Sequence, residues 1–173
     1  MIKNSKTLYK GKKILLIVIG LSVSLLADSN RFTRNDNTKI VTDHVTGLQW
    51  ADNEKGRDIS WRKAIEKCQN YILGGYDDWR VPNVNELRSI VDLESSRTIE
   101  IGKYKISLVL DPAFKLYPDL MEHRLYFWSS TSEPGSPNFF VYVVSMKYGH
   151  IDFAGYGLKD HDTNPVRCVR GGV

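Results

Sequence analysis

The sequence predicts an α+β fold in which two short helices pack against antiparallel strands. Two segments of the first half, Trp61–Ile72 and Val84–Val91, repeat apolar residues every three or four positions, as the buried face of a helix does. From Tyr126 to Arg170 the chain instead carries short runs of β-branched and aromatic residues separated by turn-forming residues. Helices followed by strands, without regular alternation, indicate an α+β rather than an α/β domain.

Residues 1–27 have the pattern of a secretory signal peptide. Five lysines and no acidic residue lie in this segment, and the apolar run Ile14–Ala27 meets the polar residues that begin at Asp28. The run is shorter than the roughly 20 residues of a membrane-spanning helix. We therefore expect cleavage near Ala27 and export to the periplasm, the cell surface or the medium, with no membrane span after cleavage. An uncleaved amino-terminal anchor is the alternative.

The charge of the chain changes once this segment is removed. The full sequence has 24 Lys and Arg against 20 Asp and Glu, a net charge of +4, but five of the lysines lie in the predicted signal. The remaining residues 28–173 carry a net charge of −1, so they lack the positive field that non-specific nucleic-acid binding requires. Their length suits a single domain, and we expect no nucleic-acid partner.

The two cysteines, Cys68 and Cys168, both lie in the predicted mature chain. In an oxidising compartment an even pair predicts a disulfide. Closing so long a loop stabilises a fold by about 4–5 kcal/mol in the chain-entropy description. The alternative is a redox or nucleophilic thiol pair, although neither cysteine belongs to a CxxC motif.

The expected elements of the first half begin with a hairpin. Residues 39–41 and 48–50 flank a polar turn at 42–47 that ends in glycine. Two helices are expected next, and after them the long segment 95–124, which contains two prolines, is expected to have little regular structure.

Each of the two helices has its own start and stop signals. The first is expected to begin after Ser60 and to end at Gly74-Gly75. Its apolar stripe is Trp61, Ala64, Ile65, Cys68 and Ile72. The second begins after Pro82, where Asn83 can cap the helix and Glu86 completes a capping box.

The last third of the chain is expected to be β-rich. The expected strands are 126–128, 139–146, 150–153 and 165–170. Residues 129–132 and 147–149 are expected to form turns. The last strand would bring Cys168 to Cys68 on the first helix.

Several ordered motifs resemble one protein family. They are FTRND, IVTDHVTGLQWAD, ISWRKAIEKC, GGYDDWRVPNVNELRSIVD, YFWSSTS and PVRCVR. Together, over about residues 32–170, they resemble the Lcl C-terminal domain-like family, named after the C-terminal region of a bacterial collagen-like adhesin. The resemblance implies a C-type-lectin-like fold, distantly related in shape to formylglycine-generating enzymes. In the adhesin the domain is implicated in attachment to sulfated glycans and in trimer formation.

This sequence departs from the adhesin in one respect. It lacks collagen-like repeats, so the resemblance leaves the oligomeric state open.

The tryptophans of these motifs are interpreted as structural. In Trp79-Arg80-Val81-Pro82 we expect Trp79 in the core and Arg80 bound to loop carbonyls or to a buried acid, rather than in a ligand site. Core positions are also expected for Trp50, Trp61 and Trp128.

Metal binding has one weak signal. Asp160, Asp162 and Asn164 alternate as the ligands of a calcium loop do, but Pro165 stands where an EF-hand needs glycine and no glutamate follows at the required distance. The four histidines lack the spacing of a zinc site. We assign no metal and no cofactor, and leave a weak calcium site open.

No catalytic residue is assigned. Residues 129–132 offer hydroxyls without a nucleophile elbow or an identifiable base. Formylglycine generation depends on active-site cysteines, and both cysteines here are expected to be paired. A non-enzymatic protein is therefore expected. The alternative is an enzyme of the formylglycine-generating shape with an unrecognised site.

The leading function is an exported ligand-binding or adhesion module that recognises a glycan or an envelope or host-surface protein. A structural envelope subunit is the other alternative. Cations and aromatic residues of the long segment are the candidate binding residues, since loops on a rigid scaffold often carry recognition. They are Lys103, Tyr104, Lys105, Lys115, Tyr117 and Arg124. Arg62, Lys63 and Lys67 of the first helix form an alternative patch.

Overall fold

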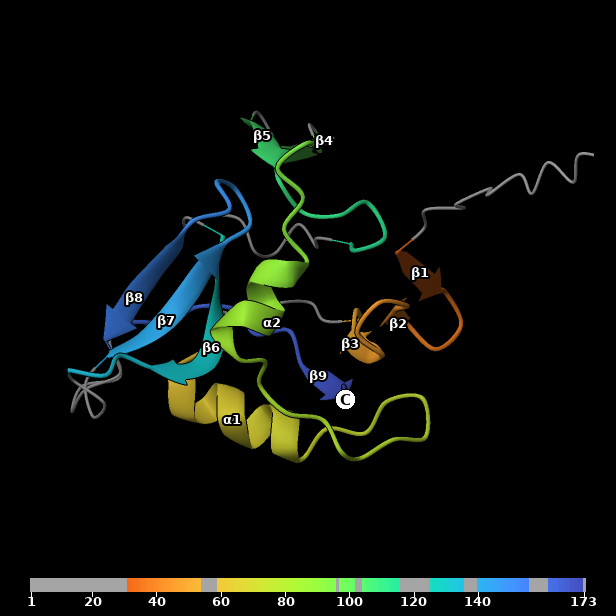
Figure 1. Ribbon diagram of the computed structural model, residues 1–173, viewed down its shortest axis with the longest axis horizontal. Helices are drawn as coiled ribbons and strands as arrows, with labels where there is room; N and C mark the ends of the chain where they lie inside the picture. Colours follow the sequence, from red (N-terminus) through yellow and green to blue (C-terminus); the bar gives the residue numbers. More distant parts are fainter. Residues whose placement is uncertain are drawn as a thin grey trace, which may run out of the picture.

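The computed structural model describes residues 31–53, 59–95, 97–101, 104–115, 125–135, 140–155 and 162–172. These ranges contain antiparallel strands and two helices, which confirms the α+β prediction (Figure 1). The elements are β1 (Phe32–Asn35), β2 (Ile40–Asp43), β3 (Leu48–Ala51), α1 (Trp61–Gln69), α2 (Val84–Ser89), β4 (Arg97–Ile101), β5 (Tyr104–Leu108), β6 (Tyr126–Ser132), β7 (Phe140–Ser145), β8 (Ile151–Gly155) and β9 (Val169–Gly171). The predicted signal peptide lies outside the described residues.

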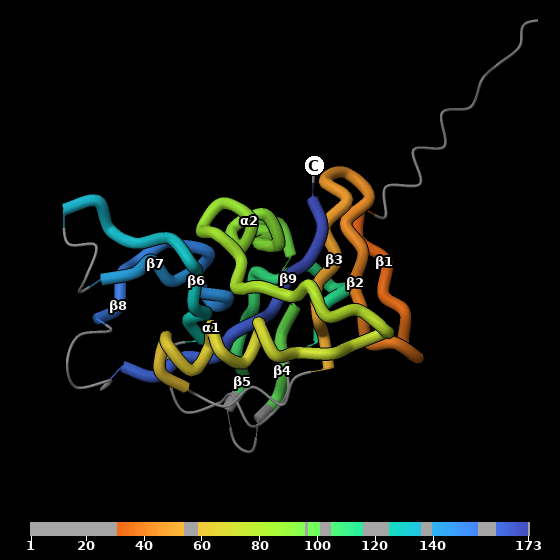
Figure 2. Tube along the Cα trace, turned by 90° about the horizontal axis from the view of Figure 1, so that it is seen from below, coloured from red at the N-terminus to blue at the C-terminus, as the bar shows by residue number. Residues whose placement is uncertain are grey.

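The first sheet has the strand order β1-β2-β3-β9. Figure 2 shows β9, near the end of the chain, lying beside β3 from its beginning. The predicted hairpin is confirmed as β2 and β3. The buried carboxylate of Asp43 holds its turn, accepting hydrogen bonds from the Val45 amide (2.9 Å) and the Thr46 hydroxyl (2.8 Å). Gly47 then adopts a φ of +72°, which glycine tolerates better than other residues.

The sheet β6-β7-β8 separates two clusters of core residues. Successive side chains of a strand point to opposite faces, so Phe127 and Val144 join one cluster while Trp128 and Val143 join the other. Helix α2 packs into the first cluster through Leu87. Helix α1 packs into the second through the residues Ala64 and Cys68. The two helices therefore cover opposite faces of this sheet.

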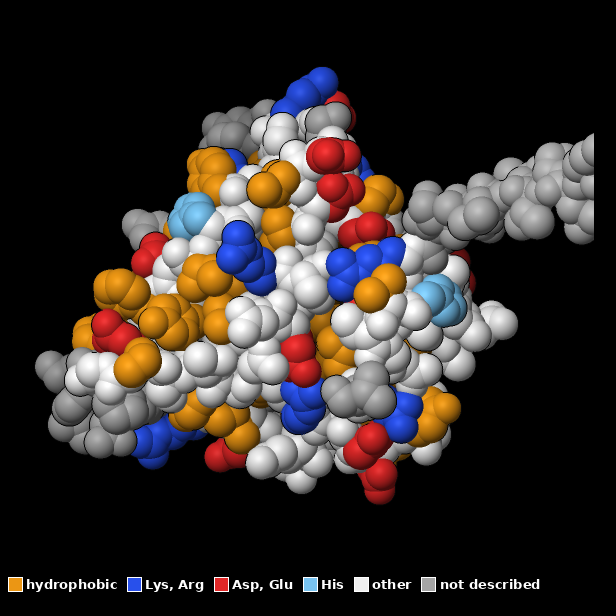
Figure 3. Space-filling view, in the orientation of Figure 1, with side chains coloured by type: hydrophobic (Ala, Val, Ile, Leu, Met, Phe, Trp, Pro, Cys, Tyr) orange, Lys and Arg blue, Asp and Glu red, His pale blue; other side chains and the backbone are white. Residues whose placement is uncertain are grey.

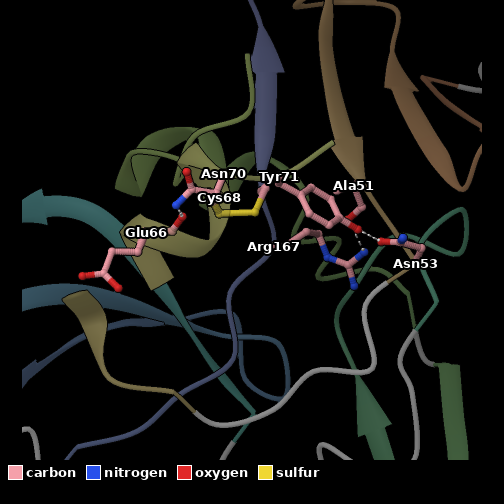
Figure 4. The surroundings of a disulfide bond; sticks show 8 residues. Ala51, Asn53, Glu66, Cys68, Asn70, Tyr71 and Arg167 are labelled. Atoms are coloured by element: carbon pink, nitrogen blue, oxygen red, sulfur yellow. Dashed lines mark hydrogen bonds between the residues drawn. A yellow bond between two sulfur atoms is a disulfide. The ribbon is translucent and has the colours of Figure 1, made fainter. Parts of the chain in front are cut away.

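The predicted disulfide is confirmed. Cys68 and Cys168 are bonded across a sequence separation of 100 residues, and both are fully buried. Figure 4 shows the bond joining α1 to the segment that leads into β9, next to Tyr71 and Arg167. The carbonyl of Cys168 also accepts a hydrogen bond from the Ala51 amide (2.9 Å). The bond thus fastens α1 to the first sheet.

Helix α1 ends earlier than predicted. It stops at Gln69: the Tyr71 amide donates to the Cys68 carbonyl (3.2 Å), three residues back, instead of continuing the four-residue pattern, and the Asn70 side-chain amide donates to the Glu66 carbonyl (2.9 Å). Ile72 is consequently not on the apolar stripe but 74% exposed. Gly74 and Gly75 form a separate tight turn with positive φ angles of 64° and 85°. The α2 prediction is confirmed, including both hydrogen bonds of the capping box.

The prediction of little regular structure for residues 95–124 is wrong for residues 97–101 and 104–108, and residues 116–124 lie outside the described residues. Strands β4 and β5 form a hairpin in which Ile99 faces Ile106. Both side chains are partly buried against the first core cluster, to which Leu110 and Phe114 also belong. The two-residue alternation of apolar side chains in this stretch was the signal for these strands.

Two predictions in the last third are also wrong in part. Residues 129–132 are not a turn but continue β6, because Ser129 donates its hydroxyl to the Tyr142 carbonyl of the neighbouring strand (2.7 Å) and Thr131 accepts the Val84 amide (3.0 Å). The last strand is shorter than predicted. The Pro165 carbonyl accepts a hydrogen bond from the Trp128 amide, and the Cys168 carbonyl accepts one from the Ala51 amide. This segment therefore pairs with two different strands in turn instead of forming one continuous ladder.

Candidate binding surface

The tryptophans of the motifs support the frame of the domain, by which we mean its helices, its sheets and the two core clusters. Trp50, Trp79 and Trp128 are buried as predicted, whereas Trp61 is half-buried and donates its indole N–H to the Ser129 carbonyl (2.8 Å). The indole N–H of Trp79 donates to the carbonyl of Tyr76 (3.1 Å). The WRVP tract therefore places its tryptophan in the core, as expected.

Arg80 of the same tract binds an acid. Its guanidinium donates to both carboxylate oxygens of Glu86, at 2.8 and 2.7 Å. Burial opposes ionisation of Glu86, but the ion pair and the Asn83 amide outweigh it and hold the pKa of this carboxyl below its ordinary value. Arg80 thus links the frame to the start of α2, as the structural interpretation of the motif expects.

A buried ionic network ties the PVRCVR tract to the first sheet. The carboxylate of Asp52 is fully buried and pairs with the guanidinium groups of Arg34 and Arg167. It also accepts the Lys115 amide (3.1 Å), and Arg167 donates to the Lys115 carbonyl (2.9 Å). The Arg167 guanidinium lies 5.1 Å from the ring centroid of Phe114. Arg34 and Arg167 are therefore neutralised by a buried acid inside the protein.

Two of the six predicted binding residues can be placed with their side chains. Lys105 pairs with Glu100 on the exposed β4–β5 hairpin (3.0 Å), and Lys115 pairs with Asp36 (2.9 Å). Arg34 and Lys115 lower the pKa of Asp36 to about 2. Lys103, Tyr117 and Arg124 lie outside the described residues, as does the side chain of Tyr104. This site stays a prediction, and its two placed cations are already paired with acids.

The alternative patch lies on α1. Arg62 and Lys63 are exposed there, whereas Lys67 is half-buried.

A pocket of about 470 Å³ lies where β1 meets the loop at Asp111–Ala113. Its volume suits a small molecule. Two cations line it, but Arg31 donates to both carboxylate oxygens of Asp43 (3.1 and 2.7 Å), and Arg34 pairs with Asp36 and Asp52. The positive charge of the pocket is therefore balanced by these acids.

The turn between β7 and β8 carries a group of exposed rings that the sequence analysis missed. Tyr148 is 58% exposed, and its ring lies nearly parallel to that of His150, with 5.7 Å between centroids and 20° between planes. The Lys147 ammonium lies 4.8 Å from the Tyr148 centroid. The hydroxyl of Tyr126 lies 2.9 Å from His150 Nε2 and 3.3 Å from Asp152 Oδ2. We call these five residues the tip cluster.

The backbone beneath the tip cluster is firmly held. Ser145 Oγ accepts the amides of Lys147 (3.3 Å) and Tyr148 (3.1 Å). Gly149 has a φ of +74°, and a Cβ added there would lie 2.7 Å from Leu93 Cδ2, so glycine permits both the turn and its close approach to the frame. The rings therefore stand on a rigid turn.

The opposite face of β7 and β8 carries an apolar strip. Phe140 and Phe153 meet edge to face with 5.5 Å between centroids, and Phe153 is 54% exposed. Tyr142 and Ile151 lie on the same face by the strand register. Figure 3 shows hydrophobic side chains gathered over these two strands.

A sequence signal for the tip cluster was present. The run from Lys147 to Phe153 places Tyr148 and His150 on either side of Gly149, a residue typical of a tight turn. Side chains at such turns usually lie at the surface. Two rings that flank a turn glycine between strands were therefore the sign of an exposed, ring-bearing hairpin.

Neither a metal site nor a membrane-spanning helix occurs among the described residues. No three histidine, cysteine, aspartate or glutamate side chains gather there as metal ligands would. Of the weak calcium candidates, Asp160 lies outside the described residues, Asp162 accepts the Gly155 amide (2.9 Å), and Asn164 bridges to the backbone of Ile59. Within the same ranges no helix has the length and apolar character needed to cross a membrane.

The sequence profile of the Lcl C-terminal domain matches residues 39–170. The chain belongs to the Lcl C-terminal domain family. No curated protein matches the chain. The matched range of this Lcl C-terminal domain includes both helices, the disulfide and the sheet β6-β7-β8, and so it confirms the family that the motifs predicted.

Proposed function

We propose that this Lcl C-terminal domain is an exported ligand-binding or adhesion module that recognises a glycan or a protein at the cell envelope or on a host surface. The observation that carries the proposal is the tip cluster, in which the exposed rings of Tyr148 and His150 lie at a rigid turn beside partly buried polar side chains. Side chains of this kind, with an apolar ring and a polar end, are enriched at recognition surfaces. The C-type-lectin-like fold implied by the family resemblance is part of the proposal.

Export is supported by the disulfide. A buried, structural cystine is typical of proteins that fold in an oxidising compartment. Together with the signal-peptide pattern of residues 1–27, it supports a periplasmic, surface or secreted location. Amino-terminal sequencing of the exported protein is expected to start near Asp28, and a chain still starting at Met1 would contradict cleavage.

A binding role is favoured over catalysis because the cysteines and the Ser129 hydroxyl form bonds inside the protein. Both cysteines are bonded to each other, and the Ser129 hydroxyl is buried and donates to the Tyr142 carbonyl. These groups hold elements of the fold together. The exposed rings, by contrast, contribute area that a partner can bury.

The test is binding of purified residues 28–173 to glycan and extracellular-protein arrays. We expect reproducible binding to a restricted set of glycans or proteins, which disappears when the protein is reduced and unfolded. A second arm measures turnover of sulfatase-type and glycosidase substrates. Turnover without array binding would favour the enzyme alternative, and capture of one envelope protein alone would favour the structural subunit.

A further inference from the structure

We infer that the tip cluster is a saccharide subsite for a neutral pyranose unit. This inference rests on the proposed binding function and deepens it, since it names the site and the chemistry of its ligand. It differs from the cationic segment predicted from the sequence, which would select sulfated chains.

The rings supply the stacking surface. The His150 ring stacks against Tyr148 and the Lys147 ammonium lies over the Tyr148 ring, yet Tyr148 is 58% exposed and His150 is exposed, so ring area remains that these neighbours do not cover. A pyranose in its chair form has one face of C–H groups and a rim of hydroxyls. Its C–H face can lie against an aromatic π-face, whose partial negative charge favours the polarised C–H bonds.

The polar chain beneath the rings leaves an acceptor for a sugar hydroxyl. Among the described residues, the Tyr126 hydroxyl lies within hydrogen-bond distance of His150 Nε2 and Asp152 Oδ2. All three groups are satisfied when Nε2–H donates to the Tyr126 oxygen and the Tyr126 hydroxyl donates to Asp152. In the neutral imidazole Nδ1 is then an acceptor, and no described residue donates to it.

The charges of the cluster select against sulfate. Lys147 and Asp152 are its only formal charges, and they cancel. An anionic glycan would meet no net positive field here, whereas a neutral sugar finds donors and acceptors of both kinds. Binding at this subsite is therefore expected to depend little on salt.

The edge of β8 is closed to a peptide strand. The amide of Phe153 donates to Asp152 Oδ1 (2.9 Å), and the amide of Gly155 donates to Asp162 Oδ2 (2.9 Å). A pairing strand needs such amides as free donors, and carboxylates at the edge oppose it. The exposed rings, rather than the backbone, are therefore the recognition groups of this hairpin.

The experiment measures binding of two neutral probes, cellohexaose and fully N-acetylated chitohexaose, and of a heparin hexasaccharide to residues 28–173 by titration calorimetry. The wild type is expected to bind at least one neutral probe with little change between low and high salt. Tyr148→Ala removes the ring and is expected to weaken binding at least about tenfold. Tyr148→Phe keeps the ring and is expected to bind within about twofold, since the Tyr148 hydroxyl makes no hydrogen bond among the described residues.

Two further variants test the polar chain and the specificity of the effect. Tyr126→Phe frees His150 to rotate and is expected to weaken binding a fewfold, as a positioning residue does. Ile72→Ser removes an apolar side chain that is 74% exposed on a different turn, and is expected to bind as the wild type does. Thermal melting of every variant verifies that the fold is retained.

The outcomes separate the two proposals. Salt-sensitive binding of heparin alone, unchanged in Tyr148→Ala, would overturn the saccharide subsite and leave the adhesion function with the cationic segment. Neutral binding that survives Tyr148→Ala would also overturn the subsite. If the wild type binds no saccharide, the inference is wrong. If the arrays show no ligand of any kind, the proposed function fails as well.

Discussion

Charged and aromatic side chains are used differently around Asp52 and at the tip of β7 and β8. Around Asp52 the carboxylate is buried, two guanidinium groups neutralise it, and Phe114 packs against one of them. At the tip, the rings of Tyr148 and His150 face solvent, and the charges of Lys147 and Asp152 lie at the surface. The first arrangement holds segments together, whereas the second leaves ring area open.

This difference shows where to look for function in the family. The motifs that identify the chain, such as WRVP and PVRCVR, make internal contacts in the structure. The run from Lys147 to Phe153 belongs to none of those motifs. Motifs that specify a frame reveal the family, while recognition is placed on the segments that the frame supports. The two regions should therefore respond differently to substitution.

The largest expected effect on the frame is loss of the disulfide. In the chain-entropy description, removing a bond that spans a sequence separation of 100 residues lowers the free energy of unfolding by about 4–5 kcal/mol. Urea unfolding of the Cys68→Ala/Cys168→Ala variant measures it. Reduction of the wild type is expected to lower the midpoint in the same way and to leave the double variant unaffected. Equal stability with and without the bond would contradict its role as a clamp.

Asp52→Asn is expected to have the next largest effect on the free energy of unfolding. The change leaves the Arg167 guanidinium buried without its counter-charge and leaves Arg34 with only the exposed Asp36, which costs about 3–5 kcal/mol. The matched control is Asp36→Asn, since Asp36 also pairs with Arg34 but is exposed, and a much smaller loss is expected. Similar losses for both variants would show that burial of the pair does not matter. Chemical unfolding at pH 7 makes the comparison.

Acid is expected to weaken the frame through Asp43. Burial opposes ionisation of Asp43, but the Arg31 guanidinium and the bonds from Val45 and Thr46 outweigh it and lower the pKa of the carboxyl. A carboxyl whose native pKa is depressed stabilises the fold above its unfolded pKa of about 4, and this stability is lost as pH falls through the native pKa. The free energy of unfolding should therefore be steady near neutrality and fall below about pH 4.

The variant Asp43→Asn tests that assignment. At neutral pH it is expected to lose about 1–3 kcal/mol, because one carboxamide cannot accept every hydrogen bond that the carboxylate accepts. Its acid slope should be shallower than that of the wild type. Asp77→Asn, at an exposed acid that forms no ion pair among the described residues, should keep the wild-type slope.

Local patterns in the sequence predicted the parts of the fold that local interactions decide. The turn before Gly47, the capping box of Asn83 and Glu86, and the apolar stripe carrying Cys68 are all encoded within a few residues. The disulfide followed from the number of cysteines and the expected compartment. The end of α1 was mispredicted because the chain leaves the helical hydrogen-bond pattern at Tyr71, before it reaches the glycines.

Long-range contacts account for most of what the sequence could not predict. Ser129 and Thr131 look like turn residues until the strand and helix that bind them are in place. Lys105 and Lys115 looked like free cations, and their partners are Glu100, across a hairpin, and Asp36, 79 residues away. The turn that carries Tyr148 lies close to Leu93 at Gly149, a contact that no local pattern contains.

The smallest expected effect on stability is that of Tyr148→Ala. The ring is mostly exposed and its removal opens no cavity, so the free energy of unfolding should change by no more than about 0.5 kcal/mol. Gly149→Ala, one residue further on, should cost about 1–3 kcal/mol, because alanine is strained at positive φ and its Cβ would press on Leu93.

Urea unfolding of these two neighbouring variants separates the rings of the tip from the frame beneath them. A loss above about 1 kcal/mol for Tyr148→Ala would mean that its ring packs on the frame, and the tip cluster would then be structural like the motifs. A negligible loss, together with weakened saccharide binding, would place stability in the frame and recognition in the rings.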